Sequence, residues 1–167
     1  GRSTGIDFRE AAPAASTTQK VLDEIAAGAI GWPSTAVPGT VAGLELVRER
    51  FGSKPLAELV APAVTLARGH RLSPRAAQSL SWQWDKLKRD AEARRIFGKG
   101  TAPLAAGDRL VQRDLAVTLE TIGKQGAPGF YAGAVAEAFE RAMQRGGGDV
   151  TRADLAAYRA KLRDPLT

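Results

Sequence analysis

The stretch Asp7-Phe8-Arg9-Glu10 holds residue types that could bind a ligand, because an arginine lies between an aromatic residue and an acid. A guanidinium presents a planar fork of donors that can grip a carboxylate through two hydrogen bonds, whereas a lysine offers only a point charge. The other interpretation is a strand-end arginine in a surface ion pair. Asp7 and Glu10 are three apart, so on a strand they would face opposite ways, which argues against joint acid–base work.

The sequence contains one histidine, His70, on which any serine triad would have to depend. It follows Gly69 at the predicted end of a helix, where a polar or positive ring suits the exposed carbonyl groups. We therefore predict a capping role for His70. No acidic residues are patterned near it as zinc ligands, and the absence of cysteine excludes disulfides and thiolate sites. We predict no metal site and no cofactor.

The motifs of several enzyme classes are absent, including the phosphate-binding loop, the GxSxG elbow, HExxH and the dinucleotide fingerprint. Gly146, Gly147 and Gly148 could approach a ligand, but three glycines after a helix are more typical of a helix stop. The segment Ser16 to Gln19 contains two threonines, and we predict a surface loop there.

The charge balance is basic, with 24 Lys and Arg against 18 Asp and Glu, a net charge of +6. Much of the excess lies between Arg68 and Arg95, where acids are interspersed, so we interpret it as a solvated helix face. No nucleic-acid module is recognisable, and we predict no nucleic-acid partner. An alternative function is a non-catalytic helical interaction domain that uses this basic face to meet an acidic partner. No apolar run is long enough for a membrane span.

The elements that must position these residues are mostly helices. The 167 residues are 44% apolar and only 6% aromatic, which favours one helical domain built from aliphatic residues and alanine. We expect one or two short strands, at Ile6–Arg9 and near Leu110, and an irregular segment over 16–39. We expect helices from Thr40 to Phe51, from Pro55 to Arg68, from Ser73 to about Phe97 as one or two helices, ahead of Gly126, ahead of Gly146, and from Thr151 to about Tyr158.

Helical spacing also predicts which side chains face inward. Trp82 and Trp84 cannot share a helix face, so one should pack inward and the other should be more exposed. Two helices carry longer apolar stripes, formed by Leu115, Leu119 and Ile122 and by Val135, Ala138, Phe139, Ala142 and Met143.

Six segments together resemble, in order and spacing, the large-subunit region of the gamma-glutamyltranspeptidases. They are DFREAAP (7–13), VPGTVAG (37–43), FGSKPLAELVAPAVTLARGH (51–70), GDRLVQRDLAVTLETIGKQG (107–126), GFYAGAVAEAF (129–139) and GGDVTRADLAAYRA (147–160).

The resemblance implies that residues 1–167 are a single fragment of that large subunit, the helical portion of an αββα sandwich of the N-terminal-nucleophile hydrolase type. In the family, the arginine at the position of Arg9 binds the α-carboxylate of the gamma-glutamyl substrate, and Asp7 and Glu10 are candidates for orienting it. The complete enzyme would transfer or hydrolyse the gamma-glutamyl group of substrates such as glutathione through an acyl-threonine intermediate. Bacterial members are exported, which implies a periplasmic or extracellular location.

The chain also departs from the family pattern. The family's nucleophile is a threonine that opens the small subunit in a Thr-Thr-His-type segment, and no such segment occurs here; Ser16-Thr17-Thr18-Gln19 has glutamine where histidine belongs. We therefore assign no catalytic residue in this chain and expect it to be inactive alone. Its expected partners are the rest of the large subunit and the small subunit, and exposed helix faces allow a homodimer of the fragment. A fragment of a related cephalosporin acylase remains an alternative.

Overall fold

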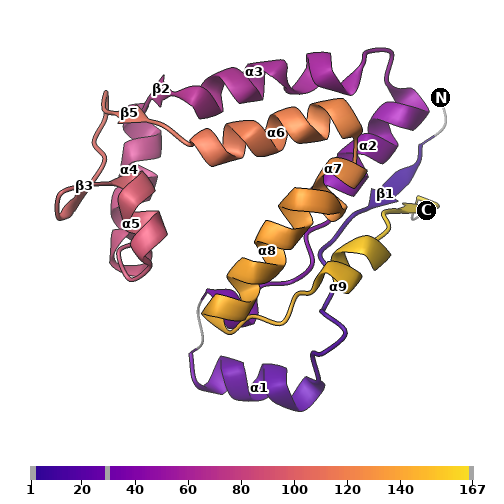
Figure 1. The fold of residues 1–167 in the computed structure, drawn as a ribbon, viewed down its shortest axis with the longest axis horizontal. Coiled ribbons are helices and arrows are strands. Elements are labelled where there is room, and N and C mark those ends of the chain that lie inside the picture. Colours follow the sequence, from indigo (N-terminus) through magenta and orange to yellow (C-terminus); the bar gives the residue numbers. More distant parts are fainter. Residues whose placement is uncertain (1–2, 29–30, 166–167) are drawn as a thin grey trace. The chain divides into compact units, whose positions relative to one another are not determined.

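The computed structural model describes residues 3–28 and 31–165, and it is mainly helical with short strands, which confirms the predicted fold class (Figure 1). The helices are α1 (Thr18–Ala26), the 3-10 helix η1 (Trp32–Ser34), α2 (Thr40–Phe51), α3 (Leu56–Arg68), α4 (Pro74–Leu87), α5 (Ala91–Phe97), α6 (Arg113–Gln125), α7 (Pro128–Tyr131), α8 (Gly133–Gly146) and α9 (Arg152–Ala157). The strands are β1 (Gly5–Asp7), β2 (His70–Arg71), β3 (Gly98–Lys99), β4 (Ala102–Pro103), β5 (Arg109–Leu110) and β6 (Lys161–Arg163).

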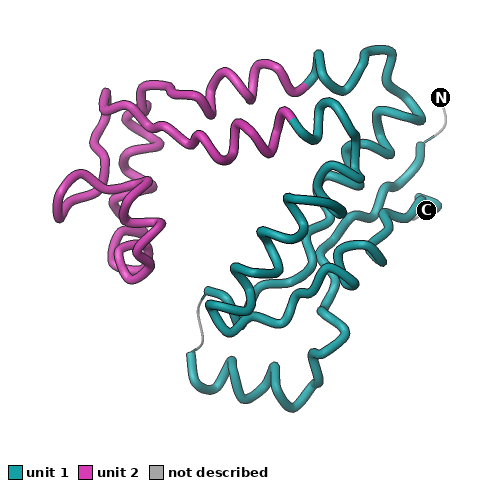
Figure 2. Tube along the Cα trace, in the orientation of Figure 1, with its two compact units in different colours: residues 1–59, 121–167 teal, residues 60–120 magenta. Residues whose placement is uncertain are grey.

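The contacts divide the chain into two compact units (Figure 2). Unit 1 comprises residues 1–59 and 121–167, and unit 2 comprises residues 60–120. Each strand pairs antiparallel with one other strand inside its own unit: β1 with β6 in unit 1, and β2 with β5 and β3 with β4 in unit 2.

Unit 1 joins the beginning of the chain to its end. Gly5 lies opposite Arg163 and Asp7 opposite Lys161 in the β1–β6 pair. Farther along, Ala11 and Val37 exchange backbone hydrogen bonds of 3.2 and 2.8 Å. The strand predicted at residues 6–9 therefore exists, but it spans Gly5–Asp7, and Arg9 lies just beyond it.

The core of unit 1 is one cluster of six buried residues against which α2, α7, α8 and α9 pack. Its members are Val37, Tyr131, Ala136, Met143, Val150 and Leu155. Helix α8 confirms the predicted amphipathic helix, but Ala136 replaces Ala138 in the buried stripe, because Ala136, Phe139 and Met143 are the residues that contact this cluster while Ala138 is exposed. Gly147, in the left-handed conformation at φ 78°, ends α8, as three consecutive glycines indicate.

Helix α1 was not expected, because the glycines and prolines of residues 28–39 suggested irregular structure throughout 16–39. The interval Thr17 to Ala27 contains neither residue type, and the Thr17 hydroxyl caps the helix by accepting from Lys20 N–H at 3.2 Å. The pair Thr17 and Thr18 is thus a helix start instead of a surface loop. Positions 29 and 30 of the predicted irregular segment lie outside the described residues.

Unit 2 has two smaller cores, one of Val64, Ala67 and Ala116 and one of Leu72, Leu104 and Leu110. Ser73 caps α4 and Asp90 caps α5, so the segment ending at Phe97 forms two helices.

The inward stripes of unit 2 were predicted correctly in one helix and only in part in the other. Trp84 is 8% exposed and Trp82 is 74% exposed, as their spacing predicted. On α6, however, Leu115 is 41% exposed, because Ala116 is the residue that faces Val64 and Ala67. Across the part of the chain that the structure describes, no helix has the length and apolarity needed to cross a bilayer.

Candidate functional site

Arg9 lies in the segment that follows β1, at the side of an open hollow of about 590 Å³. Its guanidinium side chain is 85% exposed, and its Nη2 forms an ion pair with Glu10 Oε1 at 3.2 Å. The hollow is also lined by Ser34 at the end of η1, by Pro38 and Gly39 just before α2, and by Thr40 at its start. An incoming carboxylate could therefore reach the Arg9 guanidinium without displacing any buried group.

The backbone around Arg9 is held by contacts from distant parts of unit 1. The Tyr158 hydroxyl donates to the Arg9 carbonyl oxygen at 2.7 Å, and the Arg9 N–H donates to Asp7 Oδ1 at 3.2 Å. The Ala14 N–H donates to Asp154 Oδ1 at 2.8 Å, so this segment is also tied to the N-terminal turn of α9. Thr151 and Asp154 form the capping box of that helix, which lies where the sequence predicted a helix.

Two glycines of the VPGTVAG segment let α2 approach this backbone closely. A Cβ atom on Gly39 would lie 2.1 Å from both the Phe8 carbonyl oxygen and the Tyr158 hydroxyl oxygen. A Cβ atom on Gly43 would lie 2.2 Å from the Phe8 ring. Both distances are far shorter than any real contact, so only glycine allows the Phe8–Arg9 segment to lie against α2.

The two acids near Arg9 have different roles. Glu10 pairs with the guanidinium, whereas the Asp7 carboxylate pairs with Arg163, whose Nη2 lies 2.9 Å from Asp7 Oδ2. The hydrogen bond from Arg163, followed by the one from the Arg9 N–H, lowers the pKa of Asp7 below its ordinary value. Asp7 therefore reaches Arg9 only through the backbone and ties β1 to β6.

Tyr131 and Tyr158 form a stacked pair behind the Arg9 segment, with ring centroids 5.8 Å apart and planes 8° from parallel. The Tyr131 hydroxyl donates to the Pro38 carbonyl oxygen at 2.7 Å and accepts from Ala42 N–H at 3.2 Å. Burial raises the pKa of the Tyr131 hydroxyl, which keeps it protonated as a donor. Both rings also line a second hollow of about 450 Å³.

Sequence reasoning missed this tyrosine pair. Its only local signal is the position of Tyr158 directly after a short capped helix. Tyr131 lies in α7, a four-residue helix that was not among the predicted helices. The hydrogen bond between Tyr158 and Arg9 joins residues that are 149 apart in sequence. Such a contact has no local signature, so residue spacing could not have predicted it.

The remaining candidates have structural roles. The Nδ1 of His70 lies 3.0 Å from the Leu66 carbonyl oxygen, which supports the predicted capping of α3. A Cβ atom on Gly146 would meet the Trp32 ring at 2.1 Å, and one on Gly148 would meet the Met143 sulfur at 2.5 Å, so these glycines are packed against a neighbouring segment. Within residues 3–28 and 31–165, no group of three or more acidic, histidine or cysteine side chains gathers as metal ligands would.

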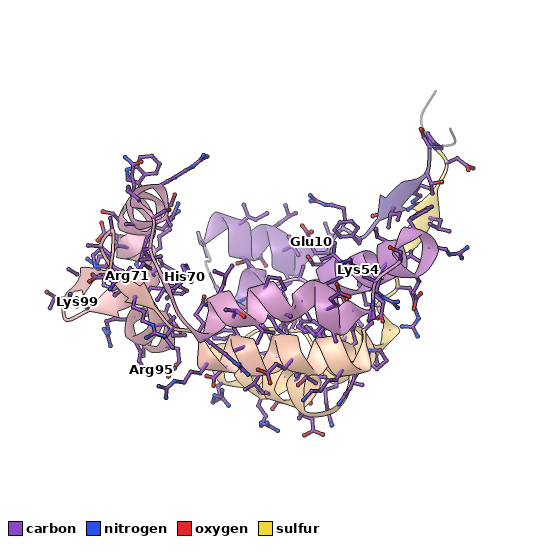
Figure 3. The ribbon with its side chains drawn as sticks, turned by 90° about the horizontal axis from the view of Figure 1, so that it is seen from above. Glu10, Lys54, His70, Arg71, Arg95 and Lys99 are labelled. Carbon is purple, nitrogen blue, oxygen red and sulfur yellow. The ribbon has the colours of Figure 1, made fainter. Side chains whose placement is uncertain are left out.

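The basic residues are concentrated in unit 2, whose 60–120 stretch contains eleven Lys and Arg and six Asp and Glu, so it carries five of the six net positive charges. Figure 3 labels Arg71, Arg95 and Lys99 on this unit. Several of its cations are paired: Arg68 with Glu120, Lys88 with Asp85, Arg95 with Glu92 and Lys99 with Asp108. The pairs are exposed, as expected of a solvated helix surface.

Comparison with known proteins identifies relatives along the whole chain. The sequence profile described as Gamma-glutamyltranspeptidase matches residues 1–167. The chain is 39% identical to the glutathione hydrolase proenzyme of Pseudomonas sp. (strain A14) and 38% identical to that of Escherichia coli (strain K12). These alignments cover 99% and 100% of this chain, which spans only 30% of the length of each relative. A crystal structure of Helicobacter pylori gamma-glutamyltranspeptidase superposes with a TM-score of 0.93 at 38% identity, over 99% of this chain and 50% of that one.

Proposed function

The chain belongs to the gamma-glutamyltranspeptidase family, and we propose that it supplies part of the substrate site of an enzyme that transfers or hydrolyses the gamma-glutamyl group of glutathione and similar compounds. Its helices match part of the structure of the N-terminal-nucleophile hydrolases of this family. The single observation that carries the proposal is the exposed Arg9 guanidinium at the side of a hollow, on a backbone segment that is hydrogen-bonded to Tyr158 and Asp154.

In this proposal Arg9 binds the α-carboxylate of the gamma-glutamyl group. Two parallel N–H···O bonds would fix the orientation of the substrate as well as its affinity, which a single ammonium could not do. The ion pair with Glu10 is solvent-exposed and engages Nη2, so the remaining guanidinium N–H groups stay open to a substrate carboxylate. Glu10 would then steady the guanidinium from its other side.

No catalytic residue is assigned within residues 1–167. The acyl-threonine intermediate would form on a nucleophile contributed by the small subunit, so the chain alone is expected to be inactive. Its partners would be the rest of the large subunit and the small subunit, and a homodimer of the isolated chain remains an expectation. The proposed location is the periplasm or the cell exterior.

The alternative function, a non-catalytic interaction domain, is favoured by one observation, the concentration of positive charge in unit 2. It makes a different prediction about which arginines matter. Under this alternative, arginines of unit 2 such as Arg75 would carry the function, and Arg9 would not.

The test uses a hybrid enzyme in which residues 1–167 replace the matching segment of the Pseudomonas sp. (strain A14) relative. Arg9→Lys should raise the KM for glutathione tenfold or more, which is about 1.4 kcal/mol of lost binding, with kcat changed much less. Arg75→Lys is the matched control, because it makes the same change at an exposed arginine of unit 2. Unchanged kinetics in Arg9→Lys would remove Arg9 from the site.

A further inference from the structure

Among residues 3–28 and 31–165, the Arg9 guanidinium pairs only with its sequence neighbour Glu10. This guanidinium is 85% exposed, and its ion pair joins two adjacent residues whose long side chains are both exposed, so this pair cannot fix a direction relative to the rest of unit 1. The direction in which Arg9 enters the hollow must therefore be set by its backbone.

That backbone is fixed at its carbonyl oxygen by one side chain, Tyr158. The hydroxyl oxygen of Tyr158 lies 2.7 Å from the Arg9 carbonyl oxygen, an ordinary distance for an O–H···O bond. Tyr158 comes from the other end of the sequence, directly after α9, so this bond joins the Arg9 segment to the C-terminal part of unit 1.

The Tyr158 ring is itself held on two sides. It stacks on Tyr131, which is 7% exposed and is bonded through its own hydroxyl to Pro38 and Ala42. The Tyr158 N–H donates to the carbonyl oxygen of Leu155, whose side chain is fully buried. The hydroxyl is thus presented by a ring that has little freedom to move.

On the side of Gly39, the space around this hydrogen bond is closely filled. The Gly39 α-carbon lies so near that an added Cβ would overlap both the Phe8 carbonyl oxygen and the Tyr158 hydroxyl oxygen. The Phe8–Arg9 peptide is therefore packed between α2 and Tyr158. Loss of the hydroxyl would remove the hydrogen bond that Tyr158 makes to the Arg9 carbonyl oxygen.

We propose that Tyr158 is a positioning residue for the reaction: its hydroxyl holds the Arg9 backbone so that the guanidinium fork faces the substrate carboxylate. This inference rests on the proposed function of Arg9. A bidentate contact depends strongly on alignment, and displacements of about 1 Å can cost large factors in enzyme efficiency. Tyr158 acts through Arg9 and does not touch the substrate.

Tyr158→Phe in the hybrid enzyme tests this role, because it removes the hydroxyl and keeps the stacked ring. The KM for glutathione should rise about three- to tenfold, the range expected for one hydrogen bond, while kcat changes little. The decisive measurement is the same substitution in an Arg9→Ala background. With no guanidinium left to align, Tyr158→Phe should then leave KM unchanged.

The matched control is Tyr131→Phe, which removes the other hydroxyl of the pair but touches Pro38 and Ala42 instead of Arg9. It should lower the melting temperature at least as much as Tyr158→Phe and raise KM less. Hydrogen exchange provides a second measurement that does not depend on activity: amides of residues 9–12 should exchange faster in Tyr158→Phe than in the parent hybrid.

The outcomes separate the two proposals. If Arg9→Ala leaves KM unchanged, the proposed function of Arg9 fails. If Arg9→Ala raises KM but Tyr158→Phe does not, or if the Tyr158→Phe effect persists undiminished without Arg9, the positioning role is overturned. Unchanged exchange over residues 9–12 in Tyr158→Phe would overturn it as well, even in a hybrid that lacks activity.

Discussion

The two units are built from the chain in different ways. Unit 1 brings together residues 1–59 and 121–167 (Figure 2). It depends on contacts such as β1 with β6 and Tyr158 with Arg9. Unit 2 is one continuous stretch, in which paired strand residues are 3 to 40 positions apart in sequence, compared with 154 to 158 for β1 and β6. The candidate substrate arginine belongs to the first unit and most of the net charge to the second, so the family resemblance and the net charge point to different units.

The cores of the two units differ in size and in how deeply they are buried. Unit 1 has one cluster of six buried residues with exposures of 0 to 7%, whereas each cluster of unit 2 has three buried residues with exposures of 3 to 9%. A larger and less solvent-exposed core can hold segments that are distant in sequence against each other. We therefore expect substitutions in unit 1 to cost more stability and to affect the Arg9 segment as well.

The largest expected effect comes from removing the most buried side chain of unit 1. Leu155 is 0% exposed, and Leu155→Ala should lower the free energy of unfolding by about 3–5 kcal/mol, because it leaves a cavity that α9 cannot fill. Leu110→Ala makes the same change in unit 2 at a residue that is 8% exposed, and it should cost about 2–3 kcal/mol. Urea denaturation followed by far-UV circular dichroism measures both.

Hydrogen exchange tells where each loss is felt. Leu155→Ala should increase exchange in residues 9–14, since Asp154 and Tyr158 hold that segment, and Leu110→Ala should not. Equal costs for the two substitutions, or loosening of residues 9–14 by both, would break the contrast between the units.

A medium effect is expected where α2 meets the Phe8–Arg9 segment. In Gly43→Ala the new methyl group would overlap the Phe8 ring, and the net cost should be about 1–2 kcal/mol after the better helix propensity of alanine is included. Because Phe8 must move, the KM of the hybrid enzyme should rise too.

Gly100→Ala is the comparison in unit 2. Gly100 has φ 65° and no atom within 4 Å of an added Cβ, so the cost of about 1–2 kcal/mol comes from backbone strain alone. Its KM should equal that of the parent hybrid. A raised KM in Gly100→Ala would show that substrate binding responds to general loss of stability, and Gly43→Ala would then say nothing specific about Arg9.

The contrast between the units also explains what sequence could predict. Helix ends with local signals were found because the stop or cap is adjacent to them, as at Gly52, Ser73, Thr151 and Gly147. Which side chains of α6 and α8 are buried was predicted only in part. Ala116 and Ala136 are buried because of the neighbouring elements they pack against, and their own hydrophobicity does not indicate this.

The candidate site also combines a residue that the sequence could indicate with supporting contacts that it could not. Arg9 was singled out through the resemblance of several segments, not through its spacing from other residues. The parts that hold it, namely Tyr158, Gly39 and Gly43, depend on contacts between distant segments, which no window of sequence contains. Asp7 was named as a candidate for orienting Arg9, but its side chain pairs with Arg163. That partner is also distant in sequence, so no local pattern indicated it.

The smallest effect is expected from removing the Asp7–Arg163 ion pair, which joins β1 to β6 in unit 1. The pKa of Asp7 is lowered by the hydrogen bond from Arg163 and then by that from the Arg9 N–H. A depressed pKa in the folded state means that the pair stabilises the fold above the unfolded value of 3.8 and ceases to do so as the pH falls through the folded value. The difference in melting temperature between Asp7→Asn and the parent should therefore be present at pH 7 and vanish in acid.

Asp108 supplies the counterpart in unit 2, with a pKa lowered first by the Ala105 N–H and then by Lys99. Its bonds span only nine residues or fewer, so Asp108→Asn should loosen a local turn, whereas Asp7→Asn should increase hydrogen exchange in both β1 and β6. Both pairs are exposed, and added salt should shrink the Lys99 and Arg163 contributions. If Asp7→Asn leaves exchange in β6 unchanged at pH 7, the ion pair does not join the chain ends, and backbone pairing alone closes unit 1.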